Sequence, residues 1–273
     1  MKNIIVPIDF SSYSEDSLHY AMNLANKLGA NVEMIFVQRK KNIFNPLTYE
    51  KEFEYADKHL KELIDKAKNK VKGEIKVNYT IRKGKVYLTV NEFANEFEFP
   101  VIVLSCFGIS GFDENFIGSN ALKIVSHSAC PVILLRNDKY VKDIETIIMP
   151  LDMSLETKQK VPITIDIANK YKSMVHLVDI SQEQVNDIRF KLRLDSNEVS
   201  HYLHKHEIQH DTELLIGKNI AGVILKYAAK KQADLIVAMS EHDRKESKLI
   251  GPNTLQLVQT SEIPVLIVPS KEE

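Results

Sequence analysis

The chain has 273 residues, of which 44% are hydrophobic, so it holds enough apolar material for two cores of ordinary size. Its formal net charge of −1 provides no broad basic field, and we therefore expect neither nucleic acid nor an anionic membrane as a partner. The short apolar runs, the polar start and two cysteines, Cys106 and Cys130, predict a cytoplasmic protein without a membrane span, signal peptide or disulfide framework.

Short β-branched runs alternate in the first half with longer segments of helical period, a pattern typical of a parallel sheet covered by helices. Strands are expected at residues 3–8, 31–37, 75–81, 100–105 and 131–136. A first helix carries the apolar face Leu18, Ala21, Ala25 and Leu28, with Ser12 and Glu15 at capping-box spacing before it. Further helices are expected over 50–71, 86–97 and 118–127.

The second half of the chain repeats the first. Residues 4–11 recur as residues 147–154, both apolar runs with a proline two residues before an aspartate. Near the ends, residues 130–135 correspond to residues 263–268. A repeat of this length indicates duplicated domains rather than a solenoid. We therefore expect one domain at 1–140, a second at 141–273, and a linker near Asn137–Asp143.

A glycine-spaced loop follows the fourth strand of the first copy. It contains Gly108 and ends in Gly118 and Ser119, where a helix begins. Ligands of open parallel sheets gather beyond the carboxyl ends of the strands, and the first turn of a helix offers amides to anions. By itself this spacing fits either a phosphate site or a structural turn.

In its context, this loop resembles the motif of the ATP-binding universal stress proteins, Gly-x2-Gly-x9-Gly-[Ser/Thr]. Gly108, nine further residues, Gly118 and Ser119 follow a first strand that reads Ile-Val-Pro-Ile-Asp, and both copies share the overall pattern. The resemblance implies an α/β fold of two tandem Rossmann-like, adenine nucleotide alpha hydrolase-like domains. Each would hold a five-stranded parallel sheet in the order 3-2-1-4-5.

The same resemblance implies an adenine nucleotide site in the first copy. Asp9 would face the adenosine, the backbone of Val37 would meet the adenine, and the glycine loop would hold the phosphates. The nucleotide-binding residues expected on this basis are Pro7, Asp9, Val37, Leu104, Ser105, Gly108, Gly118, Ser119 and Asn120. Ser105 replaces the first glycine of the family motif, and its side chain either narrows the approach of the base or ribose or only packs.

The corresponding loop of the second copy departs from the motif. Asp243 stands where Gly108 stood, the spacer before Gly251 is shorter, and Pro252 removes both a hydroxyl and a backbone donor. Glu241 and Asp243 would repel phosphate, whereas Arg244, Lys245 and Lys248 would offset that repulsion, and Asp152 matches Asp9. We favour an empty second site over one with an altered ligand.

Four histidines, His201, His204, His206 and His210, crowd into ten residues of the second copy. A metal site is one interpretation, but the expected change from helix to strand falls inside the cluster, and we favour a solvated polar surface. Walker, nucleophile-elbow and zinc-protease motifs are absent from the sequence, and the glycine loop shows no evident lysine or arginine finger.

Three functions remain open on the sequence. The favoured one is a stress-response protein that binds ATP or a related adenine nucleotide in the first domain without efficient turnover. The second is a slow ATP hydrolase that uses Mg²⁺ near Asp9, Asp113 or Glu114. The third is a nucleotide-free interaction scaffold. The last strand of each copy would leave an open sheet edge, so we expect the domains to pair within the chain, with a homodimer as a further arrangement.

Overall fold

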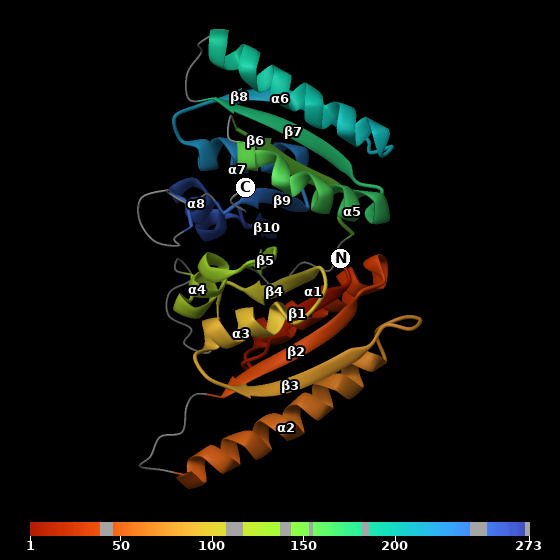
Figure 1. The fold of residues 1–273 in the computed structure, drawn as a ribbon, viewed down its shortest axis with the longest axis vertical. Coiled ribbons are helices and arrows are strands. Elements are labelled where there is room, and N and C mark those ends of the chain that lie inside the picture. The colour runs from red at the N-terminus through yellow and green to blue at the C-terminus, as the bar shows by residue number, and fades with distance from the viewer. Residues whose placement is uncertain are drawn as a thin grey trace. The chain divides into compact units, whose positions relative to one another are not determined.

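The computed structural model of the chain describes residues 1–38, 46–107, 117–136, 143–152, 155–181, 186–240 and 250–270. The backbone divides into two compact units, Met1–Val141 and Lys142–Glu273, drawn from red to yellow-green and from green to blue in Figure 1. Each unit contains one parallel sheet and its covering helices.

The sheet of the first unit has five parallel strands in the order β3-β2-β1-β4-β5. They are β1 (Asn3–Pro7), β2 (Asn31–Gln38), β3 (Val77–Lys83), β4 (Pro100–Ser105) and β5 (Val132–Leu135). The predicted fold class and strand order are confirmed. The inner strands are buried almost throughout, which is the reason that they appear in the sequence as continuous β-branched runs.

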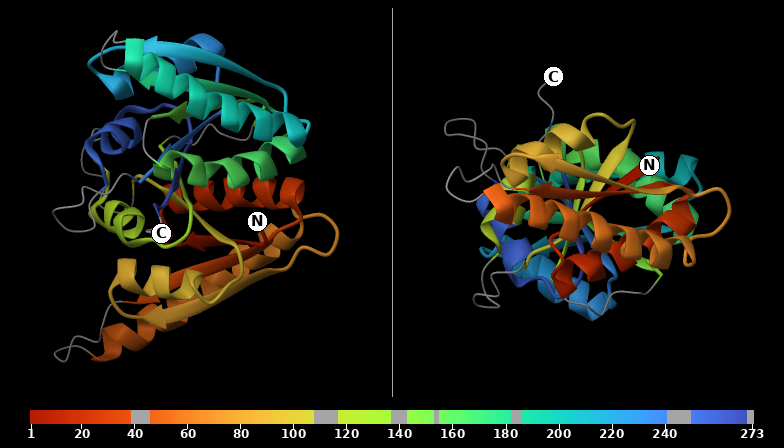
Figure 2. Two further views of the ribbon diagram at one scale, coloured as in Figure 1. Left: turned by 45° about the horizontal axis from the view of Figure 1, so that its top comes forward. Right: turned by 90° about the horizontal axis from the view of Figure 1, so that it is seen from below.

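Helices cover both faces of this sheet. They are α1 (Ser12–Leu28), α2 (Pro46–Lys68), α3 (Val86–Ala94) and α4 (Ser119–His127). Helix α1 packs on β1, β2 and β4, and α2 packs on β2 and β3. Helix α3 lies on the opposite face and packs against α4, as the views in Figure 2 show. A buried hydrogen bond from Asn91 Nδ2 to the Ile124 carbonyl, 3.1 Å long, fixes α4 to α3.

Two helix starts differ from the sequence prediction. The N-cap of α1 is Ser11, whose Oγ accepts a hydrogen bond from Ser14 N at 3.2 Å, so the predicted cap at Ser12 is wrong by one residue. Only Ser12 has a glutamate three residues later, but Ser11 is held in the capping position because both its N–H and its hydroxyl donate to the Asp9 carboxylate. Helix α2 begins at Pro46 rather than near residue 50, in keeping with the preference of proline for a first helical turn.

The second unit repeats this architecture with the strand order β8-β7-β6-β9-β10. Its strands are β6 (Thr146–Leu151), β7 (Met174–Ser181), β8 (His210–Ile216), β9 (Leu235–Met239) and β10 (Val265–Val268). Its helices are η1 (Leu155–Lys160, a 3-10 helix), α5 (Val161–Tyr171), α6 (Asn186–Lys205), α7 (Ile220–Lys231) and α8 (Pro252–Thr260).

Strand order reverses between β1 and β4 in the first unit, because the chain leaves β1 towards β2 and returns to pair β4 on the other side. Helices that follow the two strands then diverge to opposite faces, and a crevice opens at the carboxyl ends of the strands. The described helices include none that is both long enough and apolar enough to cross a membrane.

Candidate nucleotide-binding site

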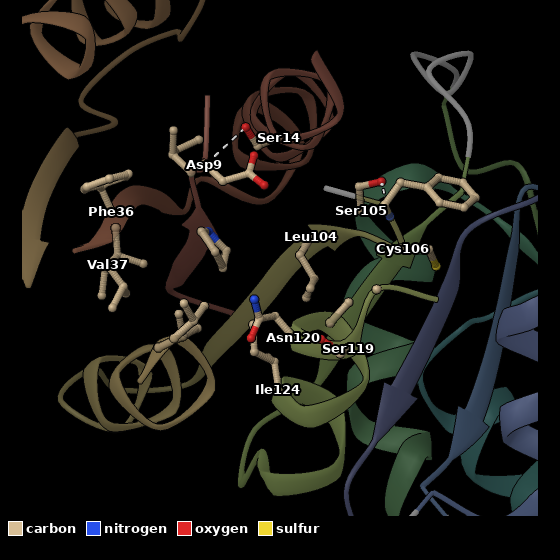
Figure 3. A pocket seen from close by; sticks show the side chains of 18 of the residues that line it. Asp9, Ser14, Phe36, Val37, Leu104, Ser105, Cys106, Ser119, Asn120 and Ile124 are labelled. Carbon is tan, nitrogen blue, oxygen red and sulfur yellow. Dashed lines mark hydrogen bonds between the residues drawn. The ribbon is translucent and has the colours of Figure 1, made fainter. Parts of the chain in front are cut away.

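A cavity of about 510 Å³ opens at the carboxyl ends of β1, β2 and β4 in the first unit. Its wall includes eight of the nine residues expected from the sequence, namely Pro7, Asp9, Val37, Leu104, Ser105, Gly118, Ser119 and Asn120. The ninth, Gly108, lies outside the described residues. In Figure 3, Phe36 and Val37 lie at one end of the cavity and Ser105 and Cys106 at the other.

Asp9 is held in place by the start of α1. Its Oδ1 accepts hydrogen bonds from Ser11 N at 3.0 Å and from Ser11 Oγ at 2.5 Å. The backbone N–H of Asp9 donates to Ser14 Oγ at 3.4 Å, drawn as a dashed line in Figure 3. Because all three bonds involve Ser11 and Ser14 of one capping turn, the Asp9 carboxylate has a fixed position beside the cavity.

Ser105 lines the cavity and shapes the turn that leaves β4. Its Oγ accepts a hydrogen bond from Phe107 N at 3.2 Å, so the hydroxyl is turned towards the following backbone. A serine side chain that bonds the amide two residues ahead is a common way to close such a turn. The sequence left open whether the Ser105 side chain narrows the approach of the nucleotide or only packs. This bond shows that the side chain has a local structural role.

Gly118 brings the loop end close to β4. Its N–H donates to the Cys106 carbonyl at 2.7 Å, and a Cβ on Gly118 would lie 3.2 Å from the same oxygen. The amide of Gly118 is therefore engaged within the protein, and its contribution to the cavity is the space left by the missing side chain.

Helix α4 points its first turn at the cavity. Ser119 and Asn120 are exposed there, and the N-cap Gly118 has no side chain with which to bond the first amides. The opening amides of any α-helix lack partners within the helix, and its dipole adds partial positive charge. This end of the cavity therefore suits a phosphate group.

The opposite end contains a residue that the sequence did not indicate. Glu52, on α2, lines the cavity with Phe36 and Val37, and its carboxylate accepts a hydrogen bond from Gln38 Nε2 at 3.1 Å. Gln38 is fully buried at the end of β2, so it holds the carboxylate against the sheet. No spacing in the sequence links Glu52 to the glycine loop, because the contact depends on how α2 packs.

Cys106 is a buried part of the cavity wall. Burial raises the pKa of its thiol to about 12, while the nearby positive charge of Arg136 acts in the opposite direction. At neutral pH the thiol is therefore protonated, and it serves as apolar wall rather than as a nucleophile.

The corresponding cavity of the second unit is much smaller, about 90 Å³. Lys160 lines it and is 3% exposed, and its Nζ donates to Thr157 Oγ1 at 3.0 Å. The Thr254 hydroxyl donates to the Met239 carbonyl at 2.7 Å, so its proton is engaged within the protein. The backbone N–H of Asp152 donates to Thr157 Oγ1 at 3.3 Å, the bond that corresponds to the one from Asp9 N to Ser14 Oγ.

The loop at 241–249, which carries Glu241, Asp243 and the three basic residues expected to offset them, lies outside the described residues. Pro252 occupies the first turn of α8 after Gly251, where the first unit has Ser119 after Gly118. A proline has no N–H, so this helix start offers one donor fewer to an anion.

The histidines singled out in the sequence have structural partners in part. The Nε2 atom of His210 shares a hydrogen bond of 2.7 Å with Ser200 Oγ, and its Nδ1 lies 2.8 Å from the Ile208 carbonyl oxygen. The ring of His206 packs on Tyr202. Within the described part of the chain, no group of three or more histidine, cysteine or acidic side chains is placed to hold a metal ion.

Known proteins share both the sequence pattern and the fold. The sequence profile of the universal stress protein family matches residues 1–136 and again residues 144–269. Universal stress protein MJ0531 of Methanocaldococcus jannaschii is 28% identical over 143 residues, which cover 50% of this chain and 84% of that protein.

Two solved structures match nearly the whole chain. A universal stress protein from Archaeoglobus fulgidus superposes with a TM-score of 0.80, at 17% identity, over 99% of this chain and 97% of its own. The functionally unknown protein PA1789 of Pseudomonas aeruginosa gives a TM-score of 0.68, at 15% identity, over 99% and 93%. At such identities the likeness shows the fold.

Proposed function

The chain belongs to the universal stress protein family, and on that premise we propose that its first domain binds ATP or a related adenine nucleotide as a regulatory ligand in a stress response. The observation that carries this proposal is the cavity of about 510 Å³ at the reversal of strand order, with the first turn of α4 at its edge. Its volume lies in the range of small-molecule sites, and its position is the one that open α/β sheets use for ligands.

The two ends of the cavity suit the two ends of a nucleotide. Phe36, Val37 and Glu52 offer apolar surface and a carboxylate acceptor, which suit a base with an exocyclic amine. Ser119 and Asn120 stand at the helix start, which suits phosphates. Asp9 lies on the wall between strands β1 and β4, where a ribose with its two hydroxyls would pass.

We expect binding rather than efficient turnover. Asp9 and Glu52 are the two acids described on the cavity wall, and both are engaged: Asp9 accepts two hydrogen bonds from Ser11 and Glu52 accepts one from Gln38, which disfavours the role of a mobile base. The alternative is slow Mg²⁺-dependent hydrolysis of ATP at Asp9, with Asp113 or Glu114 in the loop outside the described residues. ADP production by the purified protein that disappears in Asp9→Ala would favour this alternative.

Titration calorimetry with two variants of one residue tests the binding proposal. Ser119 is exposed in the first turn of α4, where an added carboxylate favours the helix dipole but repels a phosphate. Ser119→Asp should therefore fold at least as stably as the natural protein and bind ATP about tenfold more weakly. Ser119→Asn, which has the same shape without the charge, is the matched control and should keep the affinity within about threefold.

Two results would overturn the proposal. If the natural protein binds neither ATP, ADP nor AMP at millimolar concentration, the first domain is a nucleotide-free scaffold. If ATP binds and Ser119→Asp leaves its affinity unchanged, the nucleotide occupies a place other than the start of α4.

We further propose that the second domain binds no nucleotide and completes the molecule as a structural partner. Its cavity of about 90 Å³ falls well below the range of nucleotide sites, and Lys160 fills part of the wall. On this proposal the domain boundary lies between residues 140 and 141, and the two domains pair within one chain, in a cytoplasmic protein that can also form a homodimer.

A further inference from the structure

The cavity of the first unit presents an imbalance of charge. Its lining residues include the carboxylates Asp9 and Glu52 but, among the described residues, neither a lysine nor an arginine. A nucleoside polyphosphate carries several negative charges, and helix amides offset them only in part. A cation set just behind the wall would offset charge that the helix amides leave uncompensated.

Two backbone hydrogen bonds connect the end of β5, where Arg136 follows, to the start of α4, which is called here the phosphate end of the cavity. The carbonyl of Leu135, the residue before it, accepts from Cys106 N at 2.7 Å. The carbonyl of Cys106 in turn accepts from Gly118 N at 2.7 Å, where α4 begins. The end of β5 is thus two backbone hydrogen bonds from the helix start.

The side chain of Arg136 extends towards the same end. Its guanidinium carbon lies 6.0 Å from the centroid of the Phe107 ring, and Phe107 is part of the cavity wall. Its charge also acts on the Cys106 thiol, another wall residue, and works there against the rise in the pKa that burial causes. The ring contact places the positive charge beside Phe107, directly after β4, which is the end of the cavity opposite Glu52.

We infer that Arg136 is a specificity-determining residue that makes the cavity prefer nucleoside polyphosphates to monophosphates. This inference rests on the proposed nucleotide site. A guanidinium binds phosphate oxygens through paired N–H groups, and the contact with the Phe107 ring keeps this guanidinium close to the cavity wall. At the corresponding position the second unit has Pro269, after Val268, so this position carries a cation in the first unit but not in the second.

The ratio of the affinities for ATP and AMP tests this inference. In Arg136→Gln we expect ATP to bind about tenfold more weakly and AMP to change by less than about threefold, because the loss of one charged contact is felt by the outer phosphates. Arg136→Lys keeps the charge and should retain most of the preference for ATP. Raising the salt concentration should weaken ATP binding more in the natural protein than in Arg136→Gln.

Lys2→Gln is the matched control. Lys2 also lies on an aromatic ring, with its Nζ 5.4 Å from the centroid of Phe99, and it pairs with Glu98 at 2.7 Å. It precedes β1 and so stands at the amino ends of the strands, away from the cavity. This variant loses the same charge and should bind both nucleotides as the natural protein does. Thermal melting of each variant checks that the fold is kept.

The outcomes separate the two proposals. Failure of the natural protein to bind any adenine nucleotide defeats the nucleotide site and Arg136 with it. Tight ATP binding whose preference over AMP is the same in Arg136→Gln defeats the inference about Arg136 alone. Equal weakening of ATP and AMP in Arg136→Gln also defeats it, because Arg136 would then support the wall rather than select the phosphates.

Discussion

The close approach of Gly118 to β4 leads to a prediction for Gly118→Ala. An added Cβ would stand 3.2 Å from the Cys106 carbonyl oxygen, so the carbonyl or the start of α4 must shift by a few tenths of an ångström. The backbone angles of Gly118, φ −56° and ψ 137°, suit alanine, so the cost arises from the close contact and from displacement of the 2.7 Å hydrogen bond beside it. We expect a loss of about 1 kcal/mol in the free energy of unfolding.

The same shift moves the phosphate end of the cavity. The amides of Ser119 and Asn120 belong to the turn that must give way, so ATP affinity should fall by about fivefold, which corresponds to about 1 kcal/mol. Urea unfolding measures the change in stability, and titration calorimetry measures the change in affinity.

Gly29→Ala is the control for general destabilisation. Gly29 caps the end of α1 with a φ of +69° and has no atom within 4 Å of an added Cβ, so alanine there costs about 1 kcal/mol through backbone strain alone. It stands at the end of α1 away from the cavity. The reasoning is refuted if Gly118→Ala binds ATP as tightly as Gly29→Ala does at equal loss of stability.

Two further predictions concern buried groups. Burial raises the pKa of the Glu33 carboxyl, although a 2.9 Å hydrogen bond from Asn78 acts in the opposite direction. Ionised Glu33 therefore destabilises the folded state. The stability that the protonated carboxyl contributes is present below the ordinary pKa and is lost as the pH rises through the raised pKa. Glu33→Gln should therefore be more stable than the natural protein at pH 7, by less than about 1 kcal/mol, and equally stable below the ordinary pKa of 4.5. Urea unfolding at both pH values measures this difference. A Glu33→Gln variant that is less stable at pH 7 would contradict the prediction. For Cys106, with a pKa near 12 and 2% exposure, iodoacetamide at pH 8 should leave the native thiol unmodified and label it in denaturant, and mass spectrometry that finds it labelled in the native protein would refute its place in the wall.

The sequence predicted most of the sheet well because the inner strands and β5 are buried on both faces. Runs such as 100–105 and 131–136 are mainly apolar segments, and β4 and β5 follow them closely. The third strand was placed two residues early, at 75–81 rather than Val77–Lys83, because this strand is only partly buried and its pattern is correspondingly weak. Pro46 could have given the start of α2.

The candidate site was predictable where its residues share one local motif. Asp9 follows the first strand, and Gly118 and Ser119 stand at the start of a helix, so chain order alone brings them to one edge of a parallel sheet. Glu52 and Arg136 were missed because their places depend on the packing of α2 and on the hydrogen bond that joins β5 to β4. Periodicity carries no information of that kind.

The bond from the last motif glycine to the end of the preceding strand is present in both halves. Gly251 N donates to the Ser240 carbonyl at 3.1 Å, as Gly118 N does to Cys106, although Pro252 follows one glycine and Ser119 the other. This glycine is therefore needed wherever the helix must start against the strand, with or without a ligand. Counting such glycines would therefore predict two nucleotide sites in this chain, whereas the residue that follows the glycine, Ser119 or Pro252, is what distinguishes the two copies.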